Sequence, residues 1–339
     1  MVTYRMTGLL AIFLLTIAVV VADDKVEQPK PQEQPAAEAK ADEKKAEEKK
    51  PEEKKADEKP AEEKKVEEKP AEEKKPEDKP AEEKKPAPTF PDKALEDAVR
   101  AEVFEKRYND EPITAEDVKN ISRVVGKGKG IKNLEGLQHC KAIMLIDLED
   151  NEIADLSPLK ELKRLQSVTL AGNKISNIEP LAGLEKMQLL DLSRNEVSDL
   201  SSLKQMSNLR TLYVAENKLT TLQPIAELSK IWSLDAAGNQ ITDLAPVANL
   251  GWLTTLDIQR NGVTDLSPLK GLDDLDFLLL QDNKIADLAA LVEMCKKDFE
   301  GQKRFAPFLK LYLKGNPLTD EAKKQLETLK GFGVRVHLE

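Results

Sequence analysis

Apolar residues recur along the C-terminal three-quarters of the chain with a period of 22 residues. Each period is marked by an asparagine, after which apolar side chains return at fixed offsets. A fixed period of about 20–50 residues predicts a solenoid of stacked units and not a single globular core. Seven of these asparagines are spaced by 22 residues, and the eighth follows after 33: Asn151, Asn173, Asn195, Asn217, Asn239, Asn261, Asn283 and Asn316.

Within each period, the pattern predicts one short strand. In residues 167–171 we expect Val168 and Leu170 to point inward and Ser167 and Thr169 to point outward, because successive residues of a strand face opposite sides. Stacking such strands about 4.8 Å apart builds a parallel sheet over one continuous core. An asparagine amide has both donors and acceptors, so a stacked row of them can satisfy the backbone groups of the turns.

The other side of each repeat carries turn-forming residues. Aspartate four residues after the asparagine and proline seven residues after it favour turns or short 3₁₀ segments over long helices. The interval between Asn283 and Asn316 holds 11 additional residues, and the composition of residues 289–302 predicts an α-helix there.

The two ends of the repeat region predict caps, because a solenoid otherwise exposes its core and an unpaired strand edge. We expect an N-terminal cap at residues 90–140, the repeats at 141–318 and a C-terminal cap at 319–339. The first cap should contain a helix from about Asp92 to Lys106 and a second one after the N-cap Thr114. One face of the first helix carries Ala94, Leu95, Val99 and Val103.

The C-terminal cap should contain a helix headed by Thr319, followed by a strand. Two glycines, Gly331 and Gly333, end the helical pattern. The inward residues expected in the helix are Ala322, Leu326 and Leu329, and those alternating in the strand are Val334, Val336 and Leu338.

The repeat unit is L-x-x-L-x-L-x-x-N. A second motif, N-x-I-x-D-L-x-P-L, occurs at residues 151–159 and again, with valine for isoleucine, at 261–269. Together these motifs resemble those of the leucine-rich repeat family. The chain is similar to the 22-residue class best known from the bacterial internalins, over residues 90–339. The resemblance implies an α/β solenoid, a horseshoe with a parallel concave sheet, a helical N-terminal cap and a helix-strand C-terminal cap. It also implies recognition at a bacterial cell surface, although this fold carries many unrelated binding roles.

The chain before the repeats has two segments. Residues 1–22 are typical of a secretory signal, with Arg5 before an apolar stretch and a small-residue cleavage site at Ala22. An uncleaved membrane anchor is the alternative. Residues 23–89 are rich in Glu, Lys and Pro and have almost no apolar side chains, which predicts a disordered tether. The tether is either a spacer between the folded part and a surface or a solubilising tail.

The positions of the cysteines and histidines do not indicate a catalytic or metal-binding site. Cys140 falls in a core column, and it is separated from Cys295 by about seven strand spacings, or about 33 Å. A disulfide requires Cα atoms within about 7 Å, so none is expected. His139 and His337 stand at opposite ends of the repeats. We therefore expect no catalytic residues, no metal and no cofactor.

The outward positions of the concave sheet are the candidate binding site. They change from acidic in the middle to aromatic and basic towards the C-terminus, and two adjacent carboxylates require either a cationic partner or solvent. The predicted partner-binding residues are Tyr213, Asp235, Asp257, Phe277, Leu279 and Tyr312. Trp232 and Trp252 are either an exposed patch at the edge of the sheet or covers of their own loops.

These observations favour an exported, non-enzymatic protein that binds a macromolecule, a protein of unknown identity, through the concave face. The alternatives are a structural or spacer protein of the cell envelope and a regulatory subunit of an enzyme. From residue 90 onward the chain carries 39 acidic and 33 basic residues, so nucleic acid is not an expected partner. We expect a monomer that is secreted, periplasmic or at the cell surface, with membrane contact only if the first segment stays uncleaved.

Overall fold

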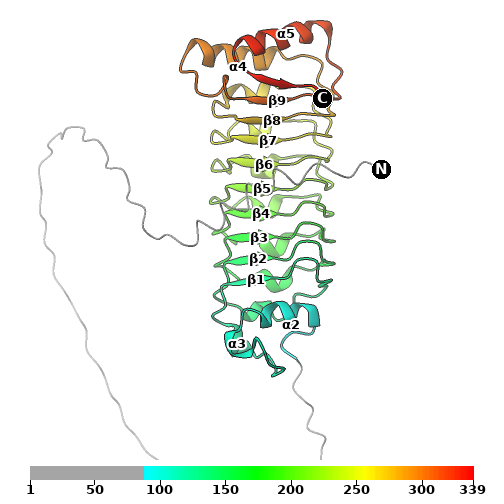
Figure 1. The fold of residues 1–339 in the computed structure, drawn as a ribbon, viewed down its shortest axis with the longest axis vertical. Coiled ribbons are helices and arrows are strands. Elements are labelled where there is room, and N and C mark those ends of the chain that lie inside the picture. Colours follow the sequence, from blue (N-terminus) through cyan, green and yellow to red (C-terminus); the bar gives the residue numbers. More distant parts are fainter. Residues whose placement is uncertain (1–87) are drawn as a thin grey trace, which may run out of the picture. The chain divides into compact units, whose positions relative to one another are not determined.

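In the computed structural model, residues 88–339 are described, and they stack into one open parallel sheet (Figure 1). The sheet has ten strands in sequence order, so each strand pairs with the strands before and after it. The strands are β1 (Arg123–Val125), β2 (Leu145–Asp147), β3 (Ser167–Thr169), β4 (Leu189–Asp191), β5 (Thr211–Tyr213), β6 (Ser233–Asp235), β7 (Thr255–Asp257), β8 (Phe277–Leu279), β9 (Lys310–Tyr312) and β10 (Arg335–His337).

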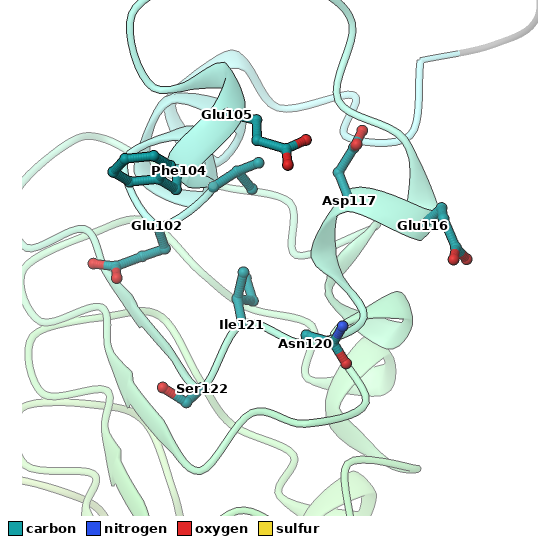
Figure 2. A pocket seen from close by; sticks show the side chains of 9 residues that line it. Glu102, Phe104, Glu105, Glu116, Asp117, Asn120, Ile121 and Ser122 are labelled. Atoms are coloured by element: carbon teal, nitrogen blue, oxygen red, sulfur yellow. The ribbon is translucent and has the colours of Figure 1, made fainter.

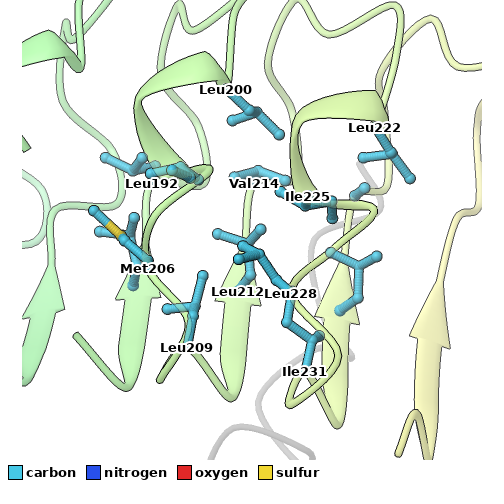
Figure 3. Packing of buried hydrophobic residues seen from close by; sticks show 14 of the residues in the cluster. Leu192, Leu200, Met206, Leu209, Leu212, Val214, Leu222, Ile225, Leu228 and Ile231 are labelled. Carbon is cyan, nitrogen blue, oxygen red and sulfur yellow. The ribbon is translucent and has the colours of Figure 1, made fainter. Parts of the chain in front are cut away.

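The core lies between this sheet and the turns that return behind it. The central residue of every strand from β1 to β9 is fully buried, as the alternation predicts. Behind the sheet, short 3₁₀ helices such as Ser201–Leu203 and Gln223–Ile225 face it across the core. Figure 3 shows Leu212 and Val214 of one repeat packing between Met206 and Leu209 on one side and Ile225 and Ile231 on the other. The pattern of turns on the convex side is confirmed.

Each asparagine of the ladder joins its own turn to the preceding repeat. The Nδ2 of Asn217 donates to the carbonyl oxygens of Val214 (3.1 Å) and Ala215 (3.1 Å) in its own repeat, and to that of Leu192 (2.9 Å) in the repeat before. Its Oδ1 accepts from the N–H of Val197 at 2.8 Å. The residue before each asparagine has a positive φ, between 53° and 78°, which lets the turn close around the amide.

The additional residues after Asn283 form a helix without disturbing the sheet. This helix, α4 (Ala289–Glu300), replaces the 3₁₀ segment of the other repeats, and Phe277 still pairs in register with Lys310. The ladder also continues, because Asn316 accepts from the N–H of Ile285 (3.1 Å) and donates to the carbonyl of Leu280 (2.7 Å). The predicted helix in this interval is confirmed.

The N-terminal cap differs from the prediction in two respects. Helix α2 (Lys93–Arg100) is shorter than expected and is followed by a 3₁₀ turn, Phe104–Lys106. It stops because the Arg100 side chain turns back to the carbonyls of Asn109 (2.9 Å) and Glu111 (2.9 Å), which folds the next loop against it. A second short helix, α3 (Ala115–Val118), begins at the N-cap Thr114 as expected.

The second difference is that the sheet begins inside the cap. Strand β1 pairs with β2 in the repeat register, and the N–H of Ile131 bonds to Asn151 Oδ1 at 2.9 Å. The first turn of the solenoid therefore precedes the region in which the sequence pattern is regular.

At the C-terminus, α5 (Asp320–Gly331) buries Ala322, Leu326 and Leu329, as the pattern indicates. Strand β10 pairs with β9 and closes the sheet. The expected alternation ends early, however, because Leu338 lies beyond the strand and is 47% exposed.

The predicted signal peptide (1–22) and nearly all of the predicted tether (23–89) lie outside the described residues. From residue 88 onward, no helix is both long and apolar enough to cross a bilayer.

Candidate functional site

The six predicted binding residues all occupy the first or third position of a strand between β5 and β9. All six are half-buried on the sheet face turned away from the core, which we call the concave face. The register places Tyr213 beside Asp235, Asp235 beside Asp257 and Leu279 beside Tyr312. Phe277 lies in the neighbouring column beside Lys310.

Asp235 and Asp257 form a carboxylate pair without a cation. Asp235 accepts a hydrogen bond from the N–H of Ala237 (3.0 Å), and Asp257 accepts from the N–H (3.1 Å) and the Nε2 (2.8 Å) of Gln259. Within residues 88–339, neither carboxylate lies within 4.0 Å of a basic side chain. The nearby Arg260 is bound to Glu216 at 3.0 Å.

Burial is the main cause that raises the pKa of both carboxyls, and the charge of Asp257 raises the pKa of Asp235 further. Burial also raises the pKa of Asp191, two strands away in the same column. Tyr213 separates Asp191 from Asp235, and burial raises its pKa as well. The middle of the concave face therefore holds acidic groups that are poorly solvated and readily hold a proton.

We expect Asp235→Asn to change how stability depends on pH. A carboxyl whose pKa is higher in the folded than in the unfolded chain contributes stability below the unfolded value, near 4, and loses it as pH rises through the folded value. Urea unfolding at pH 4 and pH 7 should therefore show a gain for the variant at pH 7 and little gain at pH 4.

The matched control is Asp199→Asn on the convex side. Hydrogen bonds from Ser201 lower the pKa of Asp199, so its contribution has the opposite sign and disappears as pH falls. An Asp235→Asn protein that gained nothing at pH 7 would show that the pair is fully solvated.

The C-terminal end of the concave face is aromatic. The Tyr312 ring stacks on the imidazole of His337, with 4.4 Å between the ring centroids and 10° between the planes. The Lys310 ammonium lies 4.2 Å from the centroid of the Phe277 ring. His337 is not among the six predicted residues, although it is the third residue of its strand and so shares the column of Tyr312.

A separate hollow of about 500 Å³ lies in the N-terminal cap (Figure 2). Three of its four acids are paired: Glu102 with Arg123 (3.0 Å), Asp117 with Lys106 (2.8 Å) and Glu116 with Lys119. Burial would raise the pKa of Asp117, but hydrogen bonds from Lys106 and Thr114 lower it to about 2. Because this chain's own cations satisfy three of the four acids, the hollow is a weaker candidate than the concave face.

The cysteines show no sign of reactivity. Cys140 and Cys295 are both buried free thiols, and burial raises the pKa of each to about 12. The described residues contain no group of three or more His, Cys, Asp or Glu side chains that could hold a metal ion.

Comparison with known proteins agrees with the architecture. A family model described as leucine-rich repeat matches residues 166–267. The solved structure of internalin C2 from Listeria monocytogenes is 29% identical, with 74% of this chain and 95% of that chain covered and a TM-score of 0.57. A search of curated proteins finds no match.

Two further solved structures, both 21% identical, share the fold. The functional domain of InlJ from Listeria monocytogenes, which is described as including a cysteine ladder, aligns with a TM-score of 0.51 over 70% of this chain and 54% of its own. The leucine-rich-repeat ectodomain of the plant receptor kinase GASSHO1/SCHENGEN3 from Arabidopsis thaliana aligns with a TM-score of 0.55 over 66% and 28%. That ectodomain was solved in complex with CASPARIAN STRIP INTEGRITY FACTOR 2.

Proposed function

We propose that this chain, whose 22-residue leucine-rich repeats form an internalin-like solenoid, is an exported protein that binds another protein through its concave face. The fold supports a binding role, because a parallel sheet of this length offers a wide continuous surface. The plant ectodomain with the same fold carries a bound protein factor, which is consistent with such a role.

The observation that carries the proposal is the carboxylate pair beside an apolar row. Two acids on adjacent strands repel each other, and Asp235 and Asp257 have no cation of their own among the described residues. A basic side chain of a partner would relieve that repulsion. Next to the pair, Leu279 and Tyr312 offer the apolar and aromatic contacts that anchor protein interfaces.

The proposal predicts different effects at the two ends of the site. Tyr312→Ala should weaken binding by at least about 1 kcal/mol, because an aromatic anchor is removed. Asp257→Asn should mainly slow association and reduce its dependence on salt, because a charge that steers the partner is removed. The partner would be captured from envelope extracts with the full chain, and both variants would then be measured by surface plasmon resonance.

Tyr108→Ala is the matched control for the aromatic substitution, since Tyr108 is 91% exposed in the N-terminal cap, far from the concave face. If a captured partner bound both variants as tightly and as quickly as the unchanged protein, the concave site would be wrong. A protein that captured no partner at all would favour the structural or spacer role, and capture of one specific enzyme would favour the regulatory subunit.

The proposal that the protein is exported rests on residues 1–22, which contain an apolar stretch followed by small residues before Asp23. Mass spectrometry of the protein recovered outside the cytoplasm should give a chain that begins at Asp23. A chain that retains Met1 would instead indicate a membrane-anchored protein.

A further inference from the structure

The edge of the sheet at which the strands begin carries a row of unpaired cations. Arg164, Lys186 and Lys230 each stand three residues before a strand, and Arg210 stands directly before β5. The first two and Arg210 are exposed, and Lys230 is half-buried. Across residues 88–339, no carboxylate lies within 4.0 Å of any of the four.

The opposite edge of the sheet shows that this is not a general property of the repeats. There, Lys174 pairs with Glu152 (2.7 Å), Lys218 with Glu196 (2.8 Å) and Arg260 with Glu216 (3.0 Å). The chain as a whole is acidic, with a formal net charge of −10. The four cations of this edge therefore differ from Lys174, Lys218 and Arg260 of the opposite edge in having no acidic partner within 4.0 Å.

Hydrogen bonds between consecutive repeats hold this row in line. The N–H of Arg210 bonds to the carbonyl of Gln188 (2.9 Å), and the N–H of Trp232 bonds to the carbonyl of Arg210 (2.9 Å). The Nζ of Lys230 bonds to the Oδ1 of Asn208 (2.8 Å). Arg164, Lys186 and Lys230 share one column with Trp252, in which Asn208 stands between the two lysines, and Arg210 shares a nearby column with Trp232. Each column advances by about 4.8 Å from one repeat to the next.

Two tryptophans continue the same line. Trp232 is 44% exposed and Trp252 is 60% exposed. The Trp232 indole bends over the preceding strand, where its Nε1 donates to Thr211 Oγ1 at 3.1 Å. Trp232 therefore contacts the preceding strand, and the more exposed Trp252 shows no such bond among the described residues. The line ends in the next repeat, where Asp274 is paired with Arg304.

We propose that this edge stripe, made of Arg164, Lys186, Arg210, Lys230, Trp232 and Trp252, binds a linear anionic polysaccharide. A row of single cations matches a polymer that carries one charge per sugar unit or so, and releasing its counterions favours binding. The flat indole faces at the end of the row suit the apolar face of a sugar ring. A flat lipid surface would need apolar side chains spread over an area, and here they sit at one end of a line.

The chain supplies its own optical probe for a test. It contains only two tryptophans, and both are in the edge stripe. Heparin, a sulfated polysaccharide, should change the tryptophan fluorescence of the full chain, with an affinity that falls as NaCl is raised. Dextran, which is uncharged, should have no effect at the same sugar concentration.

The decisive comparison is between two triple variants of equal charge. The first variant, Arg164→Gln/Lys186→Gln/Arg210→Gln, should bind heparin at least about tenfold more weakly at low salt. The slope of the logarithm of its binding constant against the logarithm of the salt concentration should become shallower by about 2–3, because each cation removed contributes about 0.7–0.9. Lys160→Gln/Lys204→Gln/Lys284→Gln removes three exposed cations that also lack acidic partners but lie away from the stripe, and should bind like the unchanged chain. Trp252→Ala should weaken binding without changing the salt slope.

Equal heparin affinities for the two triple variants, with both folded by circular dichroism, would overturn the proposal. So would tighter binding to single-stranded DNA, or to vesicles with 30% anionic lipid, that responds to the same substitutions. Because the stripe lies outside the concave face, failure here would leave the protein-binding proposal intact, and the reverse also holds.

Discussion

Asn217→Ala is expected to lower the free energy of unfolding by about 1.5–4.5 kcal/mol, since one buried N–H of the preceding repeat loses its partner, at about 1–3 kcal/mol, and one hydrogen bond to a carbonyl of that repeat is lost, at about 0.5–1.5 kcal/mol. The N–H is that of Val197 (2.8 Å), and the carbonyl is that of Leu192 (2.9 Å), which keeps the Nδ2 of Asn195 as a donor at 3.0 Å. Water cannot replace the amide there, because Asn217 is only 8% exposed. The substitution should also weaken coupling between repeats, so urea unfolding should become broader as well as earlier.

Asn177→Ala is the matched control for this substitution. Asn177 caps a turn in the same repeat class, where its Oδ1 accepts from the N–H of Glu179 at 2.9 Å, but the group is exposed. Its removal should cost about 0.5–1.5 kcal/mol. If both variants were destabilised by the same small amount, the ladder would contribute no more than a surface turn.

The second large effect is expected at Asp298. Its carboxylate accepts from three consecutive backbone N–H groups, those of Arg304 (2.8 Å), Phe305 (3.2 Å) and Ala306 (2.9 Å). Asp298 is 9% exposed, so Asp298→Ala would leave these donors without an acceptor and should cost about 2–5 kcal/mol. Amide exchange should accelerate first in residues 301–309, which lead into β9 and therefore position Tyr312.

Two variants separate the hydrogen bonds from the charge. Asp298→Asn keeps one acceptor oxygen and should lose less stability than the alanine variant. Asp273→Ala removes an exposed carboxylate 3.5 Å from Arg304 and should cost less than about 1 kcal/mol. Uniform exchange across the chain in the Asp298→Ala protein would show that the loop 301–306 does not depend on this side chain.

The repeat region was predictable because its information is local and repeated. The period determines which residue of each strand faces the core, and it places the turns and the helix after Asn283. Where the pattern is irregular, prediction failed. Nothing between Arg100 and Lys106 breaks a helix by its own propensity, and the early end of α2 depends on hydrogen bonds from Arg100 to residues nine and eleven positions away.

For the candidate site, the sequence predicted which side chains face outward but not how strongly each side chain is buried or which neighbours it contacts. Alternation indicates that Asp235 and Tyr312 face outward, but it does not indicate how far neighbours exclude water from a carboxylate. The raised pKa of Asp235 depends on burial by adjacent strands. The stacking of His337 on Tyr312 depends on the pairing of β10 with β9. The sequence pattern predicts the last strand but does not indicate the register in which it pairs.

The helix α4 shows that the two sides of this solenoid can change independently. The additional residues between Asn283 and Asn316 are accommodated on the convex side, and the concave columns pass from Leu279 to Tyr312 without a shift. Evolution, or a protein engineer, can therefore vary repeat length and ligand chemistry as separate traits. An insertion behind the sheet at another repeat, for example after Leu222, would enlarge the molecule while every outward residue kept its neighbours.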